Sequence, residues 1–141
     1  MTIQDAIDAV ITSQDLSRND AAEALKLIMN GECTQAQIAG LLVALRMKGE
    51  TVNEITGFAS TMRDMSTKVP TSREVMVDTC GTGGDGSNSF NISTTSAFVV
   101  AGVGVAVAKH GNRSASSQCG SADVLEELGV QLEQSPEQVG Q

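Results

Sequence analysis

Two segments of this chain combine glycine with small polar residues in a way that suits the binding of phosphate. The first is DTCGTGGDGSNSFNIST at 78–94, and the second is KHGNRSASSQCGSAD at 109–123. Glycine lets backbone N–H groups approach a ligand with no Cβ in between, and a helix N-terminus adds unpaired N–H donors and the positive end of its dipole. The pattern therefore predicts an anion site made of two loops, with phosphate as its guest.

The segments around these loops have the order expected of a parallel sheet. Residues 75–77 and 103–108 are short apolar runs bounded by loop residues, and each predicts a buried strand. Between them, 93–101 is rich in alanine and valine and predicts a helix. A repeated strand, loop and helix predict parallel strands, whose ligands bind at the carboxyl ends. Both loops leave from those ends, so we expect them to meet over one site.

The chain before Pro70 follows a helical period. Apolar residues recur three and four positions apart in four runs, which predict four short helices. Helix start signals precede three of these runs: Ser17, Thr34 and Thr51 each have an acidic residue or a glutamine three positions later. The runs lie at 3–11, 21–28, 38–45 and 55–62.

Composition restricts the kinds of protein this chain can be. It has 141 residues, 40% of them hydrophobic, and a net charge of −8, which argues against a nucleic-acid or anionic-membrane surface. No apolar run approaches the roughly 20 residues that span a bilayer, and residues 1–5 do not resemble a signal peptide, so we expect a cytoplasmic protein. The cysteines, Cys33, Cys80 and Cys119, form no Cys-x-x-Cys pair, and we expect reduced thiols.

The first loop also fits a dinucleotide-binding pattern. Gly81, Gly83 and Gly86 have G-x-G-x-x-G spacing after a predicted strand. The second predicted strand, however, ends in Lys109 and His110 where such a fold places an acidic residue for the ribose. No G-x-x-x-x-G-K-[ST] string occurs, which excludes a Walker A loop. We therefore favour a phosphate site of another kind.

Residues 78–94 and 109–129 resemble the anthranilate phosphoribosyltransferases of tryptophan biosynthesis, and the similarity runs from near Met1 to the end of the chain. Members of that family are longer, so the resemblance implies the first part of a complete enzyme. The fold class that the resemblance implies is α/β. An all-helical, dimer-forming domain would occupy residues 1–70, and the first, incomplete βαβα part of the donor-binding domain would occupy residues 71–141. The implied reaction moves the 5-phosphoribosyl group from phosphoribosyl pyrophosphate to anthranilate and releases pyrophosphate, with Mg²⁺ as cofactor.

The resemblance also implies a role for individual residues. Ser93 matches a magnesium ligand, Gly81 and Asn112 match anthranilate contacts, and no residue is assigned a catalytic step. Lys109 would supply a point charge to phosphate and Arg113 a forked donor. The implied contacts of phosphoribosyl pyrophosphate are Gly81, Gly84, Asp85, Ser89, Asn91, Ile92, Ser93, Thr94, Lys109, His110, Gly111, Asn112, Arg113, Ser114, Ala115, Ser116, Ser117 and Ser121.

Several of these residues have a purely structural alternative. Asn91, Ser93 and Ser121 are residue types that cap helices, and Arg113 can be a solvated surface charge. Cys80, next to a glycine loop, can be a nucleophile with His110 as its base, although its small size explains it equally well.

Two further interpretations of the whole chain stay open. A pyrimidine nucleoside phosphorylase has a related two-domain plan but resembles KHSTGG in its first loop, where this chain has DTCGTGGD. A non-catalytic helical interaction module would rely mainly on residues 1–70. The acidic pair for a second magnesium ion and the arginine for the anthranilate carboxylate lie, in the resembling family, beyond Gln141, so we expect no turnover from these residues alone.

Overall fold

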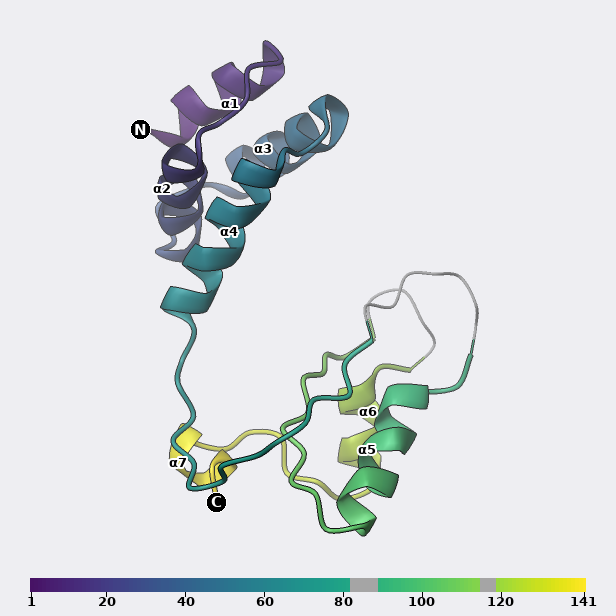
Figure 1. Cartoon of the computed structure of the whole chain (residues 1–141). Helices are drawn as coiled ribbons and strands as arrows, with labels where there is room; N and C mark the ends of the chain where they lie inside the picture. The colour runs from purple at the N-terminus through teal and green to yellow at the C-terminus, as the bar shows by residue number, and fades with distance from the viewer. Residues whose placement is uncertain (82–88, 115–118) are drawn as a thin grey trace. The chain divides into compact units, whose positions relative to one another are not determined.

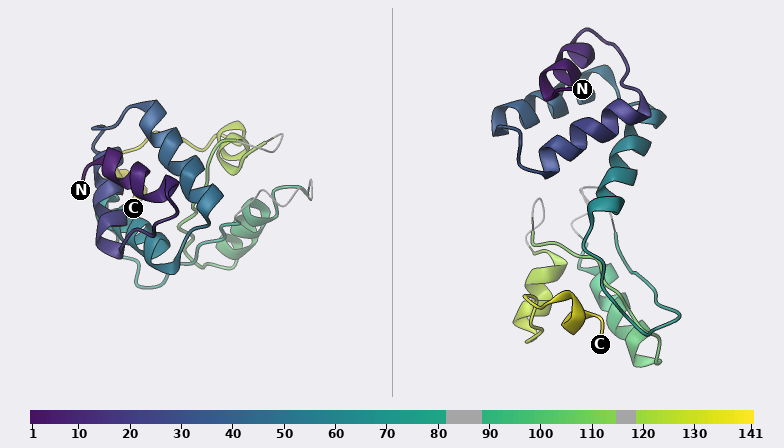
Figure 2. Two further views of the ribbon diagram at one scale, coloured as in Figure 1. Left: turned by 90° about the horizontal axis from the view of Figure 1, so that it is seen from above. Right: turned by 90° about the vertical axis from the view of Figure 1, so that its left-hand side faces the viewer.

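The computed structural model describes residues 1–81, 89–114 and 119–141. The chain divides into two compact units, Met1–Thr67 and Lys68–Gln141. Figures 1 and 2 show the first unit as a group of helices and the second as extended segments with three helices, α5, α6 and α7.

Four helices form the first unit: α1 (Ile3–Ile11), α2 (Arg18–Met29), α3 (Gln35–Lys48) and α4 (Val52–Met65). The start signals at Ser17, Thr34 and Thr51 are confirmed, because each side chain accepts a hydrogen bond from the N–H group three residues later. Thr2 caps α1 in the same way, with Asp5 completing a capping box. Each helix therefore begins where a side chain satisfies one of its unpaired amides.

The helices pack in pairs, α2 on α4 and α1 on α3, around a core of small and branched apolar residues. The approach of α4 to α2 depends on Gly57, because a Cβ there would collide with the Arg18 carbonyl oxygen and the Ala21 methyl group. The core residues are Ile3, Ala6, Val10, Leu16, Ala21, Ala24, Leu41, Ala44 and Leu45.

The second unit contains α5 (Ile92–Gly102), α6 (Ser121–Glu127) and α7 (Pro136–Val139). Val77 and Val107 form a parallel β-bridge, with Val77 N–H donating to the Ala106 carbonyl at 3.0 Å and Ala108 N–H donating to the Val77 carbonyl at 2.9 Å. The predicted parallel pairing is confirmed, but the strands predicted at 75–77 and 103–108 are wrong in extent. The two segments pair at one point only, because a pair of short strands with no third strand among the described residues is marginally stable.

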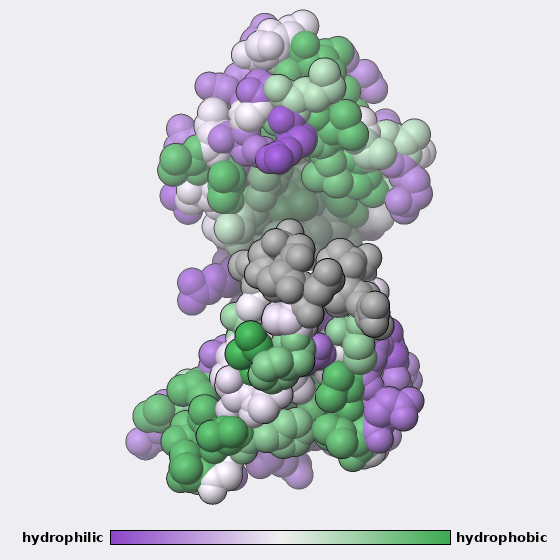
Figure 3. All heavy atoms as spheres, turned by 90° about the vertical axis from the view of Figure 1, so that its right-hand side faces the viewer, coloured by the Kyte–Doolittle hydropathy of each residue, from purple (hydrophilic) through white to green (hydrophobic). Residues whose placement is uncertain are grey.

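Apolar side chains are exposed on both units, and Figure 3 shows them in green on one face. In the second unit Phe90, Val99 and Val103 are 69%, 65% and 76% exposed, and Thr94 is the one buried residue among those described. No helix in the described ranges has the length and apolar character needed to cross a membrane.

Candidate functional site: two loops joined at the start of α5

The two glycine-rich segments meet, as their placement after parallel strands predicts. The Asp78 carboxylate accepts a hydrogen bond from the His110 N–H group at 3.1 Å. The Lys109 ammonium group donates to the Thr79 carbonyl at 3.4 Å and to the His110 carbonyl at 3.0 Å. The contacts of His110 with Asp78 and of Lys109 with Thr79 join the ends of the two paired segments, so the half-buried Lys109 is held where the two loops begin.

A third contact joins the loops at the other end of the first segment. The Asn91 side-chain amide donates to the Cys119 carbonyl at 3.4 Å and makes no capping bond to α5. Asn91 is the N-cap residue of α5, as its residue type predicts, but its side chain connects the loops and does not make the capping bond. The first-turn amides of α5 consequently receive no side-chain acceptor from their N-cap residue, an arrangement that leaves amides of this turn available to an anion.

The first turn of α5 presents two hydroxyl-bearing residues in different surroundings. Ser93 is half-buried and lies inside the helix, not at its cap, and its carbonyl accepts a hydrogen bond from the Thr79 hydroxyl at 2.8 Å. Thr94 is 2% exposed, and its Oγ1 has no hydrogen-bond partner within the described residues. A buried hydroxyl without a partner is costly, so an added hydrogen bond at the Thr94 Oγ1 would be favourable.

The second loop is packed closely against the start of α6. The N-cap residue is Gly120 and Ser121 is the first helical residue, so the capping interpretation of Ser121 is wrong. A Cβ on Gly111 would overlap the Ser121 hydroxyl, and a Cβ on Gly120 would overlap the backbone of Asn112 and Arg113. Glycine at 120 is needed for close approach of the loop backbone to the helix, whereas a side chain at 111 would require the Ser121 hydroxyl to rotate away.

Arg113 is exposed but not free in solvent. Its guanidinium group donates to both carboxylate oxygens of Glu126, at 2.6 and 3.0 Å, and to Asp123 at 3.3 Å. Hydrogen bonding to Glu126 raises the pKa of Arg113, and the same contact lowers the pKa of Glu126. The Arg113 side chain is 59% exposed, so it is a surface charge as the structural alternative predicts, and it is paired with two carboxylates.

Other predicted site residues have simpler surroundings. Gly81, Ser89 and Asn112 are exposed, and the Asn112 carbonyl accepts a hydrogen bond from Ala122 N–H at 3.2 Å. Ile92 is the exposed first residue of α5, 54% accessible. Gly84, Asp85, Ala115, Ser116 and Ser117 lie outside the described residues.

Sequence reasoning missed four residues that organise the site. The Asp78 carboxylate binds the second loop at His110, and the Thr79 hydroxyl binds the first turn of α5. The carboxylates of Asp123 and Glu126 bind the second loop from α6. Two of them had a signal in the sequence. Asp123 stands three residues after Gly120, the spacing of a capping box, and Glu126 follows three residues later on the same helical face.

Neither a thiol site nor a protein-built metal cluster appears in the described residues. All three cysteines are free, and the Cys80 thiol contacts the carbonyl of its neighbour Gly81 at 3.5 Å. No group of three or more histidine, cysteine, aspartate or glutamate side chains in the described ranges is arranged to hold a metal ion.

Known proteins are similar to this chain in sequence and in structure. Residues 4–66 match the helical bundle domain of a glycosyl transferase family, and residues 73–141 match its a/b domain. Anthranilate phosphoribosyltransferases of Desulforamulus reducens and Pelotomaculum thermopropionicum are 60% and 61% identical to this chain over 138 and 137 residues. These alignments cover 98% and 97% of this chain but 40% of each relative, so the chain spans about two-fifths of the length of the curated relatives it matches.

The crystal structure of anthranilate phosphoribosyltransferase from Thermus thermophilus is similar to this structure with a TM-score of 0.84. It is 48% identical in sequence, and the match covers 96% of this chain and 41% of that chain. The resemblance to anthranilate phosphoribosyltransferases is confirmed, as is the fold class of a helical domain followed by part of an α/β domain. With both of its domain models matched in order along nearly the whole sequence, the chain belongs to this glycosyl transferase family.

Proposed function

We propose that this chain supplies the helical domain and the donor-binding loops of an anthranilate phosphoribosyltransferase. The reaction moves the 5-phosphoribosyl group of phosphoribosyl pyrophosphate onto the amine of anthranilate and releases pyrophosphate. Relatives that carry this name match nearly every residue of the chain, which supports the proposal over a nucleoside phosphorylase or a helical interaction module. Departure of pyrophosphate leaves positive charge on the ribose, so the protein's task is to place and neutralise the leaving group.

The observation that carries the proposal is the uncapped start of α5 beside Lys109. The Asn91 side chain connects to Cys119 instead of capping the helix, and the Lys109 side chain lies across the beginning of both loops. The Thr79 residue that Lys109 contacts also bonds the first turn of α5, and we infer that the ammonium charge and the amides of this turn act on one ligand. They are the donors that a pyrophosphate needs, and the buried Thr94 hydroxyl adds one more.

Magnesium fits this site as an ion that arrives with the phosphates. Mg²⁺ prefers oxygen ligands, keeps several waters and is commonly held by one or two protein groups together with substrate phosphates. The hydroxyl of Ser93 in the first turn of α5 is such a group. When bound, the ion would neutralise charge on the pyrophosphate.

Anthranilate would lie beside the donor, near Gly81 and Asn112. Gly81 is exposed, and a Cβ placed on it meets no described atom within 4 Å. The Asn112 carbonyl is already bonded to Ala122, so its side chain is the group that remains for the acceptor.

Calorimetric titration of the chain with phosphoribosyl pyrophosphate tests the proposal. We expect heat of binding that requires Mg²⁺ and that is abolished by competing pyrophosphate. Binding of NAD or of a nucleoside in place of the donor would contradict it. A second test replaces the matching segment of the Thermus thermophilus relative with this chain and assays transfer to anthranilate. An inactive chimera that still folds would contradict the assignment of these loops.

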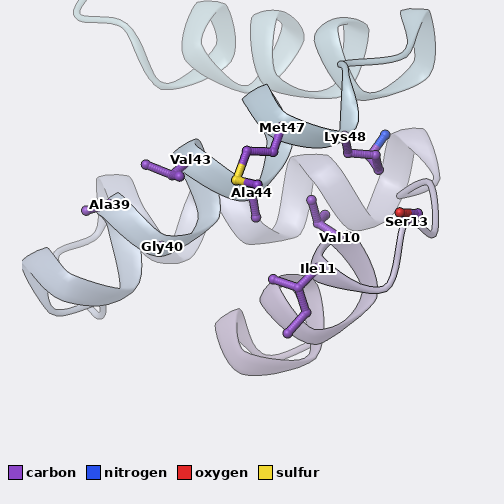
Figure 4. Close-up of a pocket in the computed structure, with 9 residues that line it drawn as sticks. All are labelled: Val10, Ile11, Ser13, Ala39, Gly40, Val43, Ala44, Met47 and Lys48. Carbon is purple, nitrogen blue, oxygen red and sulfur yellow. The ribbon is translucent and has the colours of Figure 1, made fainter.

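We also propose that the helical unit forms a symmetric homodimer. A groove of about 550 Å³ lies between α1 and α3, and Figure 4 shows its lining of mostly apolar side chains. Ile11, Val43 and Met47 line it and are 62%, 58% and 83% exposed. Apolar surface of this kind is stabilised by burial against a second copy. For location we propose the cytoplasm, since all three cysteines are free thiols.

A further inference from the structure

Three side chains join the second loop to α6: Arg113 from the loop, and Asp123 and Glu126 from the helix. We call them the α6 clasp. Glu126 receives both arms of the Arg113 fork, and Asp123 receives a third bond from the same guanidinium at 3.3 Å. Asp123 and Glu126 lie three residues apart and so share one face of α6. The bidentate geometry gives this exposed pair more directional preference than a single-contact ion pair has.

Asp123 extends the clasp to the loop backbone. Its Oδ2 accepts the Ser114 N–H group at 2.9 Å and the Gly120 N–H group at 2.8 Å. These backbone hydrogen bonds, from Ser114 first, lower the pKa of Asp123. Two points of the chain that are six residues apart are therefore fixed to one carboxylate, and that carboxylate is fixed in turn by Arg113.

The same contacts decide what Arg113 can do for an anionic ligand. A phosphate that took the Arg113 fork would have to displace the Glu126 carboxylate. It would then lie close to two like charges, Glu126 and Asp123, with their cation partly withdrawn. That exchange is unfavourable compared with the use of Lys109, whose contacts in the described part of the chain are carbonyl oxygens and not carboxylates.

We propose that Arg113 is a positioning residue, which acts through Glu126 and Asp123 to set the backbone of 111–114 against α6, and that its guanidinium stays on Glu126 when the donor binds. This differs from the role of a direct phosphate ligand. The inference rests on the proposed function for its ligand, phosphoribosyl pyrophosphate. Its structural part stands on the contacts of the clasp alone.

The first experiment needs no ligand. Amide hydrogen exchange of Ser114 and Gly120 is measured by NMR in the wild type and in Arg113→Ala, Glu126→Ala and Glu127→Ala variants. Glu127 is the matched control, an exposed glutamate at the end of the same helix. We expect Arg113→Ala and Glu126→Ala to accelerate both amides by a similar factor, roughly threefold to tenfold, and Glu127→Ala to leave them unchanged. Wild-type exchange in both clasp variants would overturn the proposal.

The second experiment is a double-mutant cycle on donor affinity. If Arg113 acts through Glu126, Arg113→Ala and Glu126→Ala lower the donor affinity by the same factor. The double variant then binds the donor as well as either single variant does. The exchanged pair, Arg113→Glu with Glu126→Arg, recovers the affinity. If Arg113 holds a phosphate, Arg113→Ala weakens binding far more, Glu126→Ala strengthens it, and the exchanged pair loses binding. The second pattern would overturn the proposal.

Milder variants guard against loss of folding. Glu126→Gln keeps the shape of the side chain and one acceptor oxygen, and Arg113→Lys keeps the charge but loses the fork, so both should show intermediate exchange rates. If the wild type binds no donor at all, the proposed function is contradicted. The amide exchange rates then still test whether Arg113 positions the loop backbone through the α6 clasp.

Discussion

The carboxylate of Glu54 in α4 and the ammonium group of Lys48 at the end of α3 lie 3.0 Å apart in the helical unit, with 0% and 6% of their side chains exposed. Glu54 also accepts hydrogen bonds from the N–H groups of Leu16 at 2.9 Å and Thr51 at 2.7 Å. Lys48 makes a second ion pair with Asp15 at 2.8 Å. One carboxylate thus links the start of α4 to the end of α3 and to the segment that precedes α2.

Removal of the Glu54 charge should destabilise the helical unit strongly. Glu54→Gln removes the buried partner of Lys48, which keeps its exposed partner Asp15, and we expect a loss of about 2 kcal/mol in the free energy of unfolding. Urea unfolding followed by circular dichroism measures it. Glu23→Gln is the matched control, because Glu23 pairs with Lys26 at 3.0 Å on an exposed surface and should change stability by less than about 0.5 kcal/mol.

The stability of the same unit should depend on pH in a direction set by Glu54. Burial, the largest single effect, raises the pKa of Glu54, but hydrogen bonds from Leu16, Thr51 and Lys48 outweigh it and hold the pKa below the ordinary 4.5. The folded state therefore binds fewer protons than the unfolded state near that pH, so this stabilisation is complete above pH 4.5 and is lost as the pH falls through the lowered value. A urea series against pH should show this slope in the wild type and a smaller one in Glu54→Gln.

Two glycine-to-alanine substitutions should have opposite effects. At Gly57 the new methyl group would overlap the backbone of α2 at Arg18, and we expect destabilisation of about 2 kcal/mol. At Gly40, within α3, the methyl group meets no atom within 4 Å, and we expect stabilisation of about 0.5 kcal/mol from the better helix propensity of alanine. Unfolding should be measured in dilute, monomeric protein. Equal effects at both sites would contradict the packing of α4 on α2.

Lys109 should contribute to donor binding through charge. Lys109→Ala removes a half-buried ammonium group from the place where the loops meet, and we expect the affinity for phosphoribosyl pyrophosphate with Mg²⁺ to fall at least tenfold, or about 1.4 kcal/mol. Calorimetry measures this, with Lys26→Ala on the helical unit as the control. Unchanged affinity after loss of Lys109 would remove that residue from the site.

The groove between α1 and α3 should be needed for association. Met47→Glu puts a charge in place of the most exposed large apolar side chain of the groove. In sedimentation velocity at micromolar concentration, we expect the wild type to be a dimer and this variant to be a monomer. Val52→Glu, at an 80% exposed position outside the groove, serves as the control and should stay dimeric. A monomeric wild type would contradict the proposed dimer.

The sequence by itself determined the features that depend on near neighbours in the chain. The helix starts at Ser17, Thr34 and Thr51 were predictable, because a cap and its acceptor lie three residues apart. The meeting of the two loops was predictable as well, since parallel strands place their carboxyl ends together.

Tertiary structure decided the features that depend on contacts between distant residues. Asn91 and Ser121 have the residue type of helix caps, but the second loop offers Asn91 the Cys119 carbonyl and places Gly120 at the cap of α6. A single bridge at Val77 replaced two predicted strands, because the apolar pattern of a segment cannot show how many neighbours it pairs with. Propensity acts within a few residues, whereas the partner of a side-chain amide or a strand is chosen by whatever the fold brings alongside it.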